Sequence, residues 1–436
     1  MGYKVIQIQS NGRMFASLDF CKKTIAAGAT EFSPALHGYC REQHDFLTGA
    51  DGSFNQTVKG IKNLKSLGAF VLTNTVVVKP NYRDVPKIAS LLVKLGVDQF
   101  QFAFVHALGN AWENFDNMVP CVSLAAPFIH KGLQIGIDAG KSVMAEAMPY
   151  CCMRGYENYV AERVIPDTII RGSKIQNTDD YKSQRLNYGK MKFPKCRSCV
   201  YYGVCEGPWR EYPEQKGEEE FKPIRPGFME GMLLREFEDV LDGKKKVQRG
   251  VISLRNVELL KKIYLQNDLQ LEFSDFEVDY DRGLTKKQGK GNLIFYASKD
   301  SSASELKEIE ALDQDDPKIT RRIGRMLGYP ECCIEFFIRH RNKTTPEIIM
   351  DAISNTKEPQ AELNIIEYPR ISHIPCSLDC SESLEMVSIS EGEREKMASR
   401  YHYYVSGAFE NLDTGRKSKG DFKGSFDAEK IVVEFR

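Results

Sequence analysis

The sequence has 436 residues, 42% of them hydrophobic and 28% charged, which is ordinary for a globular protein of two or three domains. Lys and Arg together number 60, as do Asp and Glu, so no net charge draws the chain to nucleic acid or to a membrane surface. No apolar run approaches the roughly 20 residues of a transmembrane helix, and the first residues resemble neither a signal nor a transit peptide. Composition therefore predicts a cytoplasmic protein whose 12 cysteines stay reduced and act more readily as ligands than as disulfides.

Predicted strands and helices alternate over the first 150 residues. Apolar and β-branched stretches predict strands over residues 5–8, 32–36, 70–78, 102–105 and 133–137. Helices are expected between them, one from Ser53, as the N-cap, to Leu67 and one from Val85 to Leu95. Strands that alternate with helices are typical of βα units in a parallel sheet, where ligands bind beyond the carboxyl ends of the strands. The fold class predicted for this region is α/β.

A block of five cysteines follows this region. Cys196, Cys199 and Cys205 form C-x2-C-x5-C, and the pair Cys151 and Cys152 precedes them. Four thiolates from two such segments suit an iron–sulfur cluster or a tetrahedral metal ion. A structural zinc site would prefer two C-x2-C pairs, so the cluster is favoured while zinc stays open. In an extended chain the second cysteine of the pair would point away, which makes Cys151 the better candidate.

The strand ends and the cysteine block resemble a known family. Residues 9–13 (Gln-Ser-Asn-Gly-Arg), 33–38 (Ser-Pro-Ala-Leu-His-Gly) and 73–77 (Thr-Asn-Thr-Val-Val) resemble the third, fourth and fifth strands of the radical S-adenosylmethionine (radical SAM) enzymes. The cysteine block, with the rigid and aromatic residues 206–213 that are expected to cover the site as a lid, is similar to the SPASM and twitch extensions of that family. The resemblance covers about residues 1–225.

The resemblance implies a fold and two cofactors. Residues 1–148 would form a partial parallel (β/α) barrel without its first two βα units, and residues 149–225 a cysteine-rich extension. That extension would hold an auxiliary [4Fe–4S] cluster on Cys151, Cys196, Cys199 and Cys205. S-Adenosylmethionine would be contacted by Asn11, Ser33, His37 and Asn74. Each of these four could equally satisfy local backbone groups in a turn.

One departure from the family pattern concerns the reaction itself. Radical SAM enzymes carry C-x3-C-x2-C after their first strand, and that cluster cleaves S-adenosylmethionine to a 5′-deoxyadenosyl radical. The only C-x3-C here, Cys376 to Cys380, lies far from such a position and lacks the third cysteine. We expect a truncated gene assignment or a split gene with an N-terminal partner chain, the alternative being a descendant without that cluster. The chain as given is not expected to generate the radical by itself.

The character of the sequence changes after Pro226. Residues 226–264 are expected to be a linker with a helix from Met229 to Leu241, and residues 265–436 a C-terminal α+β domain. Residues 321–337 predict a helix, a Gly-Tyr-Pro turn and a second helix. The Gly-Tyr-Pro-Glu-Cys-Cys and His-x2-Cys-x3-Cys segments resemble an uncharacterised, mainly archaeal domain family.

The C-terminal domain has its own candidate metal site. Cys333, Cys376 and Cys380 are the expected ligands, with His373 or Cys332 as the fourth, for zinc or a second cluster. A helix beginning at Cys376 would put Cys376 and Cys380 on one face. Neighbouring cysteines on a helix lie about 100° apart, so Cys333 is preferred to Cys332. Two alternatives remain open, namely cysteines packed in a core and a redox disulfide.

Two classes of function remain at this point. The first is a radical SAM oxidoreductase or transferase, or the larger part of one, acting on an unknown small molecule, peptide or protein. The second is a non-catalytic iron–sulfur or zinc protein, such as a partner subunit that holds the cluster. Nothing in the sequence signals a nucleic acid or a membrane as partner, and sheet architecture alone does not fix the substrate.

Overall fold

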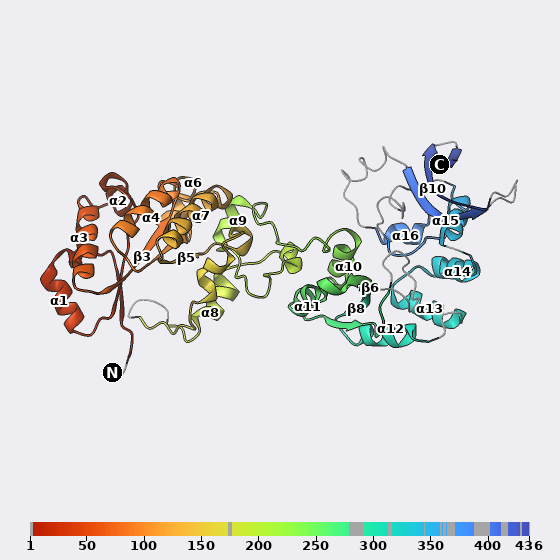
Figure 1. The fold of residues 1–436 in the computed structure, drawn as a ribbon, viewed down its shortest axis with the longest axis horizontal. Helices are drawn as coiled ribbons and strands as arrows, with labels where there is room; N and C mark the ends of the chain where they lie inside the picture. The colour runs from red at the N-terminus through yellow and green to blue at the C-terminus, as the bar shows by residue number, and fades with distance from the viewer. Residues whose placement is uncertain are drawn as a thin grey trace. The chain divides into compact units, whose positions relative to one another are not determined.

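The computed structural model describes residues 3–172, 177–278, 291–312, 316–343, 345–357, 360, 363, 371–387, 402–410, 417–427 and 430–435. The chain divides into two compact units, residues 1–224 and 225–436. Figure 1 colours unit 1 from red to yellow-green and unit 2 from green to blue.

Unit 1 is built on a five-stranded sheet in the order β1-β2-β3-β4-β5. Its strands are β1 Gln7–Ser10, β2 Glu31–Pro34, β3 Phe70–Val77, β4 Gln99–Phe104 and β5 Ser142–Glu146. All four neighbouring pairs run parallel. Sequence order and spatial order coincide, so each connection is a βα crossover and the carboxyl ends of all five strands meet at one edge. The α/β prediction with a parallel sheet is confirmed.

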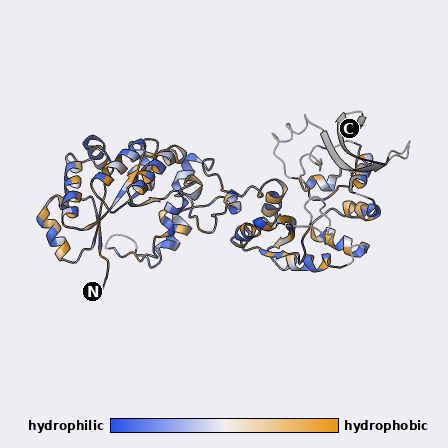
Figure 2. Cartoon of the chain, in the orientation of Figure 1, coloured by the Kyte–Doolittle hydropathy of each residue, from blue (hydrophilic) through white to orange (hydrophobic). Residues whose placement is uncertain are grey.

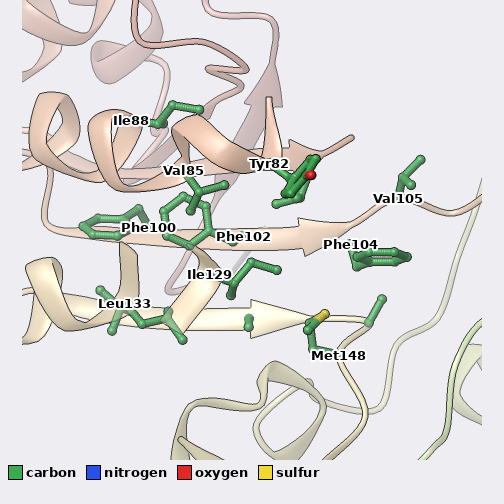
Figure 3. Close-up of a cluster of buried hydrophobic side chains, with 14 of the residues drawn as sticks. Tyr82, Val85, Ile88, Phe100, Phe102, Phe104, Val105, Ile129, Leu133 and Met148 are labelled. Atoms are coloured by element: carbon green, nitrogen blue, oxygen red, sulfur yellow. The ribbon is translucent and has the colours of Figure 1, made fainter. Parts of the chain in front are cut away.

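Nine α-helices occur in the described part of unit 1. They are α1 Leu18–Ala26, α2 Arg41–Thr48, α3 Ser53–Ser66, α4 Val85–Lys94, α5 Asn110–Glu113, α6 Phe115–Met118, α7 Val122–Asp138, α8 Tyr181–Gln184 and α9 Glu211–Lys216. Helices α3, α4 and α7 bury apolar residues in the same core as the strands. Figure 3 shows part of this core, with Val85 and Ile88 of α4 and Ile129 and Leu133 of α7 beside Phe102 of β4.

One face of the sheet is packed in the core and the other is only partly buried. Burial alternates along β3 and β4, because successive side chains point to opposite faces. Phe100, Phe102 and Val143 lie on the buried face, where a Cβ on Gly136 of α7 would come within 2.4 Å of Val143 and 2.5 Å of Phe100. The missing side chain of that glycine therefore lets α7 lie directly on the sheet.

The opposite face carries polar side chains at corresponding register positions. Gln9 pairs with Ser33, and Asn74 pairs with Gln101. The Gln101 side chain donates a hydrogen bond of 2.8 Å to Glu146. This face, called the polar face below, is defined by Gln9, Ser33, Asn74, Gln101 and Glu146. An amide- and carboxylate-rich surface ending at the carboxyl edge is where an α/β sheet binds ligands.

The predicted strand over residues 133–137 is wrong. These residues belong to α7, and the fifth strand is β5. Ile129, Leu133 and Gly136 are buried at helical spacing, and a short apolar run does not by itself distinguish a buried helix from a strand. The helix expected from Ser53 is confirmed as α3, but Gly52 is its N-cap.

Residues 149–224 form the remainder of unit 1 in short turns rather than long elements. They include the 3-10 helices η3 Tyr150–Cys152, η4 Glu157–Tyr159, η5 Ala161–Arg163 and η7 Pro194–Ser198, and the π-helix η6 Arg185–Gly189. Val160 pairs with Ala145 of β5. Tyr212 of α9 packs its ring against Phe104 at the end of β4, with centroids 5.7 Å apart. This segment therefore packs against the carboxyl ends of β4 and β5.

Unit 2 combines helices with two antiparallel three-stranded sheets. One sheet has the order β6-β8-β7, with β6 Val247–Ser253, β7 Gln270–Phe273 and β8 Asn292–Ser298; the other has the order β11-β10-β9, with β9 His402–Glu410, β10 Lys417–Asp427 and β11 Lys430–Phe435. The helices are α10 Gly231–Leu241, α11 Val257–Leu265, α12 Ser302–Glu310, α13 Pro317–Met326, α14 Glu331–His340, α15 Thr345–Ser354 and α16 Ser381–Glu385. The predicted pair of helices around the Gly-Tyr-Pro turn is confirmed as α13 and α14.

The helices are two-sided in both units, with hydrophilic and hydrophobic residues on each (Figure 2). Such helices bury one stripe against their own unit and leave the other to solvent. Among the described helices, none has both the length and the apolar character that crossing a membrane requires.

Candidate functional site

The four residues expected to contact a cofactor lie along the carboxyl half of the sheet. Asn11 follows β1, Ser33 lies in β2, His37 follows β2 and Asn74 lies in β3. Ala35 pairs with Asn74 across β2 and β3. The Asn11 side chain accepts a hydrogen bond from Arg13 N at 3.2 Å, so it is used in a local turn. The role of the four in binding a cofactor stays a prediction.

The partly buried His37 and the buried His44 form a pair just beyond the end of β2. The two rings stack with centroids 6.0 Å apart. His37 Nδ1 accepts from Val76 N at 3.3 Å, and His44 Nδ1 accepts from His37 N at 3.0 Å. Burial, followed by the charge of His44, lowers the pKa of His37 from 6.5 to about 4. Both rings must be neutral to accept these bonds, so His37 holds β2 against β3.

Three buried side-chain oxygens in unit 1 lack a partner among the described residues. Thr73 Oγ1 and Asn74 Oδ1 lie in β3, the latter on the polar face, and Glu162 Oε2 lies beside the end of β5. The other oxygen of Glu162 accepts from Ala147 N at 2.8 Å, and Ala147 has a left-handed φ of 59°. Buried acceptors without a donor cost free energy, and backbone strain of this kind collects at functional sites. Both features sit at the sheet edge where ligands are expected.

The first set of cysteines, Cys151, Cys196, Cys199 and Cys205, comes from two segments that an aromatic contact joins. Cys151 lies in η3, directly beyond β5, and Cys196 lies in η7. Tyr150 and Tyr201 stack with ring centroids 4.5 Å apart, which joins the turn after β5 to the C-x2-C-x5-C segment. Cys205 N donates to Tyr201 O at 2.8 Å, so the same stack positions the last cysteine.

The thiols of this set perturb one another. Burial raises the pKa of Cys205 to about 11, and the charges of Cys151 and Cys199 add to that rise. Burial also raises the pKa of Cys196, again with contributions from Cys151 and Cys199. Backbone N–H groups of Tyr150 and Gly207 oppose the rise at Cys205 by hydrogen bonding its sulfur.

The adjacent Cys152 does not point away from Cys151, as an extended chain would require. The two residues form a 3-10 turn, and their sulfurs are 3.9 Å apart. The hydrogen bond between them is the main cause that lowers the pKa of Cys151 and raises that of Cys152. The argument against Cys152 from strand geometry is therefore wrong, although the preference for Cys151 agrees with its influence on both Cys196 and Cys205.

A buried ion network lies beside the first set, and sequence reasoning did not find it. Arg185 donates two hydrogen bonds of 2.7 Å to Glu206, the residue after Cys205. Lys190, whose side chain is 1% exposed, pairs with Glu162 and lies 3.6 Å from Glu206. Burial, followed by the charge of Glu162, raises the pKa of Glu146 on the polar face. The network therefore connects the cysteine segment to the polar face.

The aromatic residues after Cys205 pack against the sheet. Trp209 stacks on His106, which follows β4, with ring centroids 3.8 Å apart and planes 4° apart. Lys190 Nζ lies 4.8 Å from the centre of the Trp209 ring. A Cβ on Gly207 would come within 1.8 Å of Met191 O, so only glycine allows this backbone approach. The role of residues 206–213 as a lid over a cofactor stays a prediction.

Four cysteines of unit 2 also converge, and these are called the second set. Cys332 and Cys333 lie in the first turn of α14, while Cys376 and Cys380 precede α16. Each offers a sulfur, and all four sulfurs lie within 4.8 Å of one another. Cys376 does not begin a helix as predicted, because α16 starts only at Ser381.

His373 stands beside the second set rather than in it. Its Nε2 is hydrogen bonded to Ser383 Oγ at 2.9 Å, and Ser383 Oγ lies 3.3 Å from Cys333 Sγ. His373 Nδ1 is buried without a partner among the described residues. The sequence left either Cys332 or His373 as the fourth ligand, and the sulfur of Cys332 is the one that lies close to the other three cysteines. At the first turn of a helix two neighbouring thiols can both turn toward an approaching loop, which mid-helix positions 100° apart seldom allow.

The comparisons with known proteins match parts of the chain. A family model described as "Protein of unknown function (DUF483)" matches residues 300–401. The chain is 28% identical over 113 residues, 26% of its length, to a protein from Methanosarcina barkeri named AdoMet-dependent heme synthase. It is 36% identical over 74 residues, 17% of its length, to an uncharacterized protein from Methanothermobacter thermautotrophicus. The matches span 32% and 40% of these two relatives.

A solved structure, that of Streptococcus suis SuiB bound to S-adenosylmethionine, is similar with a TM-score of 0.33 and 14% sequence identity, over 51% of this chain and 58% of SuiB. The name of the first of these relatives records a dependence on S-adenosylmethionine and a role in heme synthesis for that protein. The unit 2 match falls in a family whose description assigns no activity.

Replacing Gly207 by Ala should destabilise unit 1 by about 3 kcal/mol or more, because overpacking adds to a strained left-handed φ. Gly49 also has a left-handed conformation, with φ 64° and ψ 24°, but no atom lies within 4 Å of a Cβ built on it. Gly49→Ala is therefore the matched control and should cost only about 1–2 kcal/mol. Both tryptophans, Trp112 and Trp209, lie in unit 1, so denaturant unfolding followed by tryptophan fluorescence reports on this unit. Equal losses of unfolding free energy in the two variants would contradict the close approach of Gly207 to Met191 O.

Replacing Lys190 by Met should destabilise unit 1 by roughly 3–5 kcal/mol, because it leaves buried carboxylates without their cation. Lys192 is exposed and donates to Tyr202 O. Lys192→Met is the control and should change the unfolding free energy by less than about 1 kcal/mol. The double variant Lys190→Met, Glu162→Gln should recover part of the loss. A Lys190 variant as stable as wild type would show that the network does not hold the segment.

Unit 1 should lose stability as the pH falls from 6.5 toward 4. The pKa of His37 in the folded protein, about 4, is below its ordinary value of 6.5, so the unfolded chain binds more protons in this window. The full effect is roughly 3 kcal/mol for His37. In His37→Asn the amide oxygen can still accept from Val76 N without titrating, so its stability should depend less steeply on pH. Identical pH slopes for the two proteins would contradict the assignment.

Proposed function

We propose that unit 1 is the part of a radical SAM enzyme that carries the auxiliary [4Fe–4S] cluster and one wall of the ligand site. The cluster would be bound by Cys151, Cys196, Cys199 and Cys205. The observation that carries the proposal is the position of Cys151 directly beyond the carboxyl end of β5, together with its electrostatic influence on Cys196 and Cys205. The similarity over 113 residues to a protein named AdoMet-dependent heme synthase supports the cofactor class.

The order of the cysteines in the sequence favours a cluster over a single ion. A structural zinc site would prefer two C-x2-C pairs, whereas this set has C-x2-C-x5-C and one remote cysteine. In a cubane cluster each of four thiolates binds its own iron. An iron–sulfur cluster supplies one-electron chemistry when bound, and the protein contributes its position and its surroundings.

The residues around the set have defined tasks in this proposal. Backbone N–H groups of Tyr150 and Gly207 donate to Cys205 and stabilise its thiolate. Tyr150 and Tyr201, which stack on each other, would limit the access of water to a bound cluster. Glu206 is neutralised by Arg185 and Lys190, so a carboxylate can stand next to a ligand cysteine without adding net charge.

The polar face would bind a ligand through hydrogen-bond donors of that ligand. Asn74 Oδ1 and Glu162 Oε2 are acceptors without protein partners among the described residues. A ligand with amino, amide or hydroxyl groups satisfies both. S-Adenosylmethionine has such groups, and so would a polar substrate. Asn11, Ser33 and His37 would line the same edge, with His37 acting through β2–β3 geometry rather than by direct proton transfer.

The sequence of residues 1–436 has no C-x3-C-x2-C motif. We propose that the cysteines of the cluster that cleaves S-adenosylmethionine are supplied from outside these residues. The second candidate function, a non-catalytic iron–sulfur subunit, is favoured by the same observation, and activity measurements separate the two.

Anaerobic reconstitution should give about four irons and four sulfides at the first set, with thiolate-to-iron charge-transfer absorption. Cys199→Ala should lose this iron and the absorption, and should lower the stability of unit 1, because metal binding contributes folding free energy. Cys121→Ser, outside both sets, is the control and should keep both. Stoichiometric zinc without iron after reconstitution would contradict the cluster.

The same reconstituted protein is expected to form no 5′-deoxyadenosine from S-adenosylmethionine and dithionite. Co-expression with a segment that supplies C-x3-C-x2-C should produce it. Turnover by residues 1–436 alone would mean that the cysteines have been misassigned. A chain that stays inactive with every such segment, while keeping its cluster, would support the non-catalytic subunit.

A further inference from the structure

The second set of cysteines has a narrower geometry than the first. Cys332 Sγ lies 3.8 Å from Cys333 Sγ and 3.6 Å from Cys380 Sγ, and Cys333 Sγ lies 3.7 Å from Cys380 Sγ. Three sulfurs therefore form a nearly equilateral triangle. The fourth, from Cys376, lies within 4.8 Å of all three.

This spacing matches the edges of a tetrahedron around one metal ion. With metal–sulfur bonds of about 2.3 Å, tetrahedral coordination places the sulfurs about 3.8 Å apart. A cubane cluster would separate them further, because each thiolate binds a different iron. We propose that Cys332, Cys333, Cys376 and Cys380 hold a single tetrahedral metal ion of the zinc type. This site is independent of the function proposed for unit 1.

The surroundings fit four thiolates rather than four thiols. Cys376 N donates to Cys333 Sγ at 3.3 Å, and Ser383 Oγ lies at the same distance from that sulfur. His373 Nε2 lies 2.9 Å from Ser383 Oγ. Four thiolates around a divalent ion carry a net charge of about −2, and donors of this kind stabilise it. His373, which orients Ser383, acts as an outer partner that fixes a ligand in place.

The site is closed, which points to a structural role. Four protein ligands leave no open position for water or substrate, as in structural zinc sites. Two ligands come from the start of α14 and two from the residues before α16. The ion would therefore fasten segments that are more than 40 residues apart in the chain. Both segments lie within the residues matched by the family of unknown function, 300–401.

Two other interpretations of the four cysteines, a disulfide and a packed core without metal, predict different properties. A disulfide requires sulfurs about 2.05 Å apart, and none of the 12 cysteines, all of them in described positions, forms one. Thiols packed in a core would touch at similar distances, and Cys333 and Cys380 do border apolar residues such as Ile353 and Leu378. A packed core, however, binds no metal and is indifferent to a chelator.

The test uses the full-length chain and measures zinc, iron and sulfide per chain. Wild type is compared with a variant in which the four cysteines of the first set are Ala, with the variant Cys376→Ala, Cys380→Ala, and with the control Cys121→Ser. We expect one zinc per chain in wild type, in the first-set variant and in the control, and a loss of at least tenfold in the Cys376/Cys380 variant. The iron content per chain should be the same in wild type and in the Cys376/Cys380 variant.

A second measurement covers the case in which the Cys376/Cys380 variant does not fold. In the first-set variant, cobalt should replace zinc and give the intense visible bands of a tetrahedral tetrathiolate. Alkylation mapped by mass spectrometry should spare Cys332, Cys333, Cys376 and Cys380 until a chelator is added. Four irons with sulfide bound by these residues would overturn the single ion. Absence of metal, no cobalt bands and alkylation unaffected by chelator would show a packed core.

Discussion

The arrangement of unit 1 depends on how it pairs charges that are shielded from water. Arg185, Lys190, Glu162 and Glu206 have side chains between 1% and 7% exposed. Ions so deeply buried are tolerated only when they are paired and hydrogen bonded. Lys190 and Glu206 lie on either side of Cys196, Cys199 and Cys205 in the chain. Glu162 accepts a hydrogen bond from Ala147, the residue after β5. The pairing therefore holds the cysteine segment against the carboxyl edge of the sheet. The position of the first set of cysteines follows from this constraint.

The two sets of cysteines differ in how their geometry is imposed. The first set is spread over a turn after β5 and a long irregular segment, and aromatic stacks and the ion network hold it together. The second set is positioned mainly by hydrogen bonds. Asn355 Nδ2 donates to Cys376 O at 3.2 Å, Leu378 N donates to Thr356 Oγ1 at 2.8 Å, and Ser383 Oγ lies 3.3 Å from Cys333 Sγ. The segment that carries Cys376 and Cys380 is therefore held against the residues that follow α15 as well as against the start of α14.

The sequence predicted the βα part of the structure well because its signals are local. The strands β1, β2, β3 and β4 and the helices α3 and α4 follow from apolar periodicity and turn residues within a few positions of each other. The error over 133–137 arose where a short apolar run fits two periods equally well. The sequence therefore predicted the fold class correctly, but it predicted a strand over residues 133–137, which belong to helix α7.

Much of the candidate site was less accessible from the sequence. Cysteine spacing located both sets, because a ligand type that clusters in a reducing chain is distinctive. Lys190 and Glu162 are 28 residues apart and Arg185 and Glu206 are 21 apart, and ordinary charged residues at such separations carry no pattern that marks them as partners. The same holds for His37 and Val76, whose contact depends on strand register rather than on composition.

Cys205, Glu206 and Gly207 place three different demands on three consecutive positions. Cys205 interacts with the other thiols, Glu206 pairs with the buried Arg185, and Gly207 lets the backbone pass close to Met191. A substitution at one position leaves the others in place, but an insertion or deletion shifts all three at once. The length of the chain between Cys199 and Gly207 should therefore be nearly fixed during evolution. Length variation, more than residue identity, would separate the working parts of this segment from its spacers.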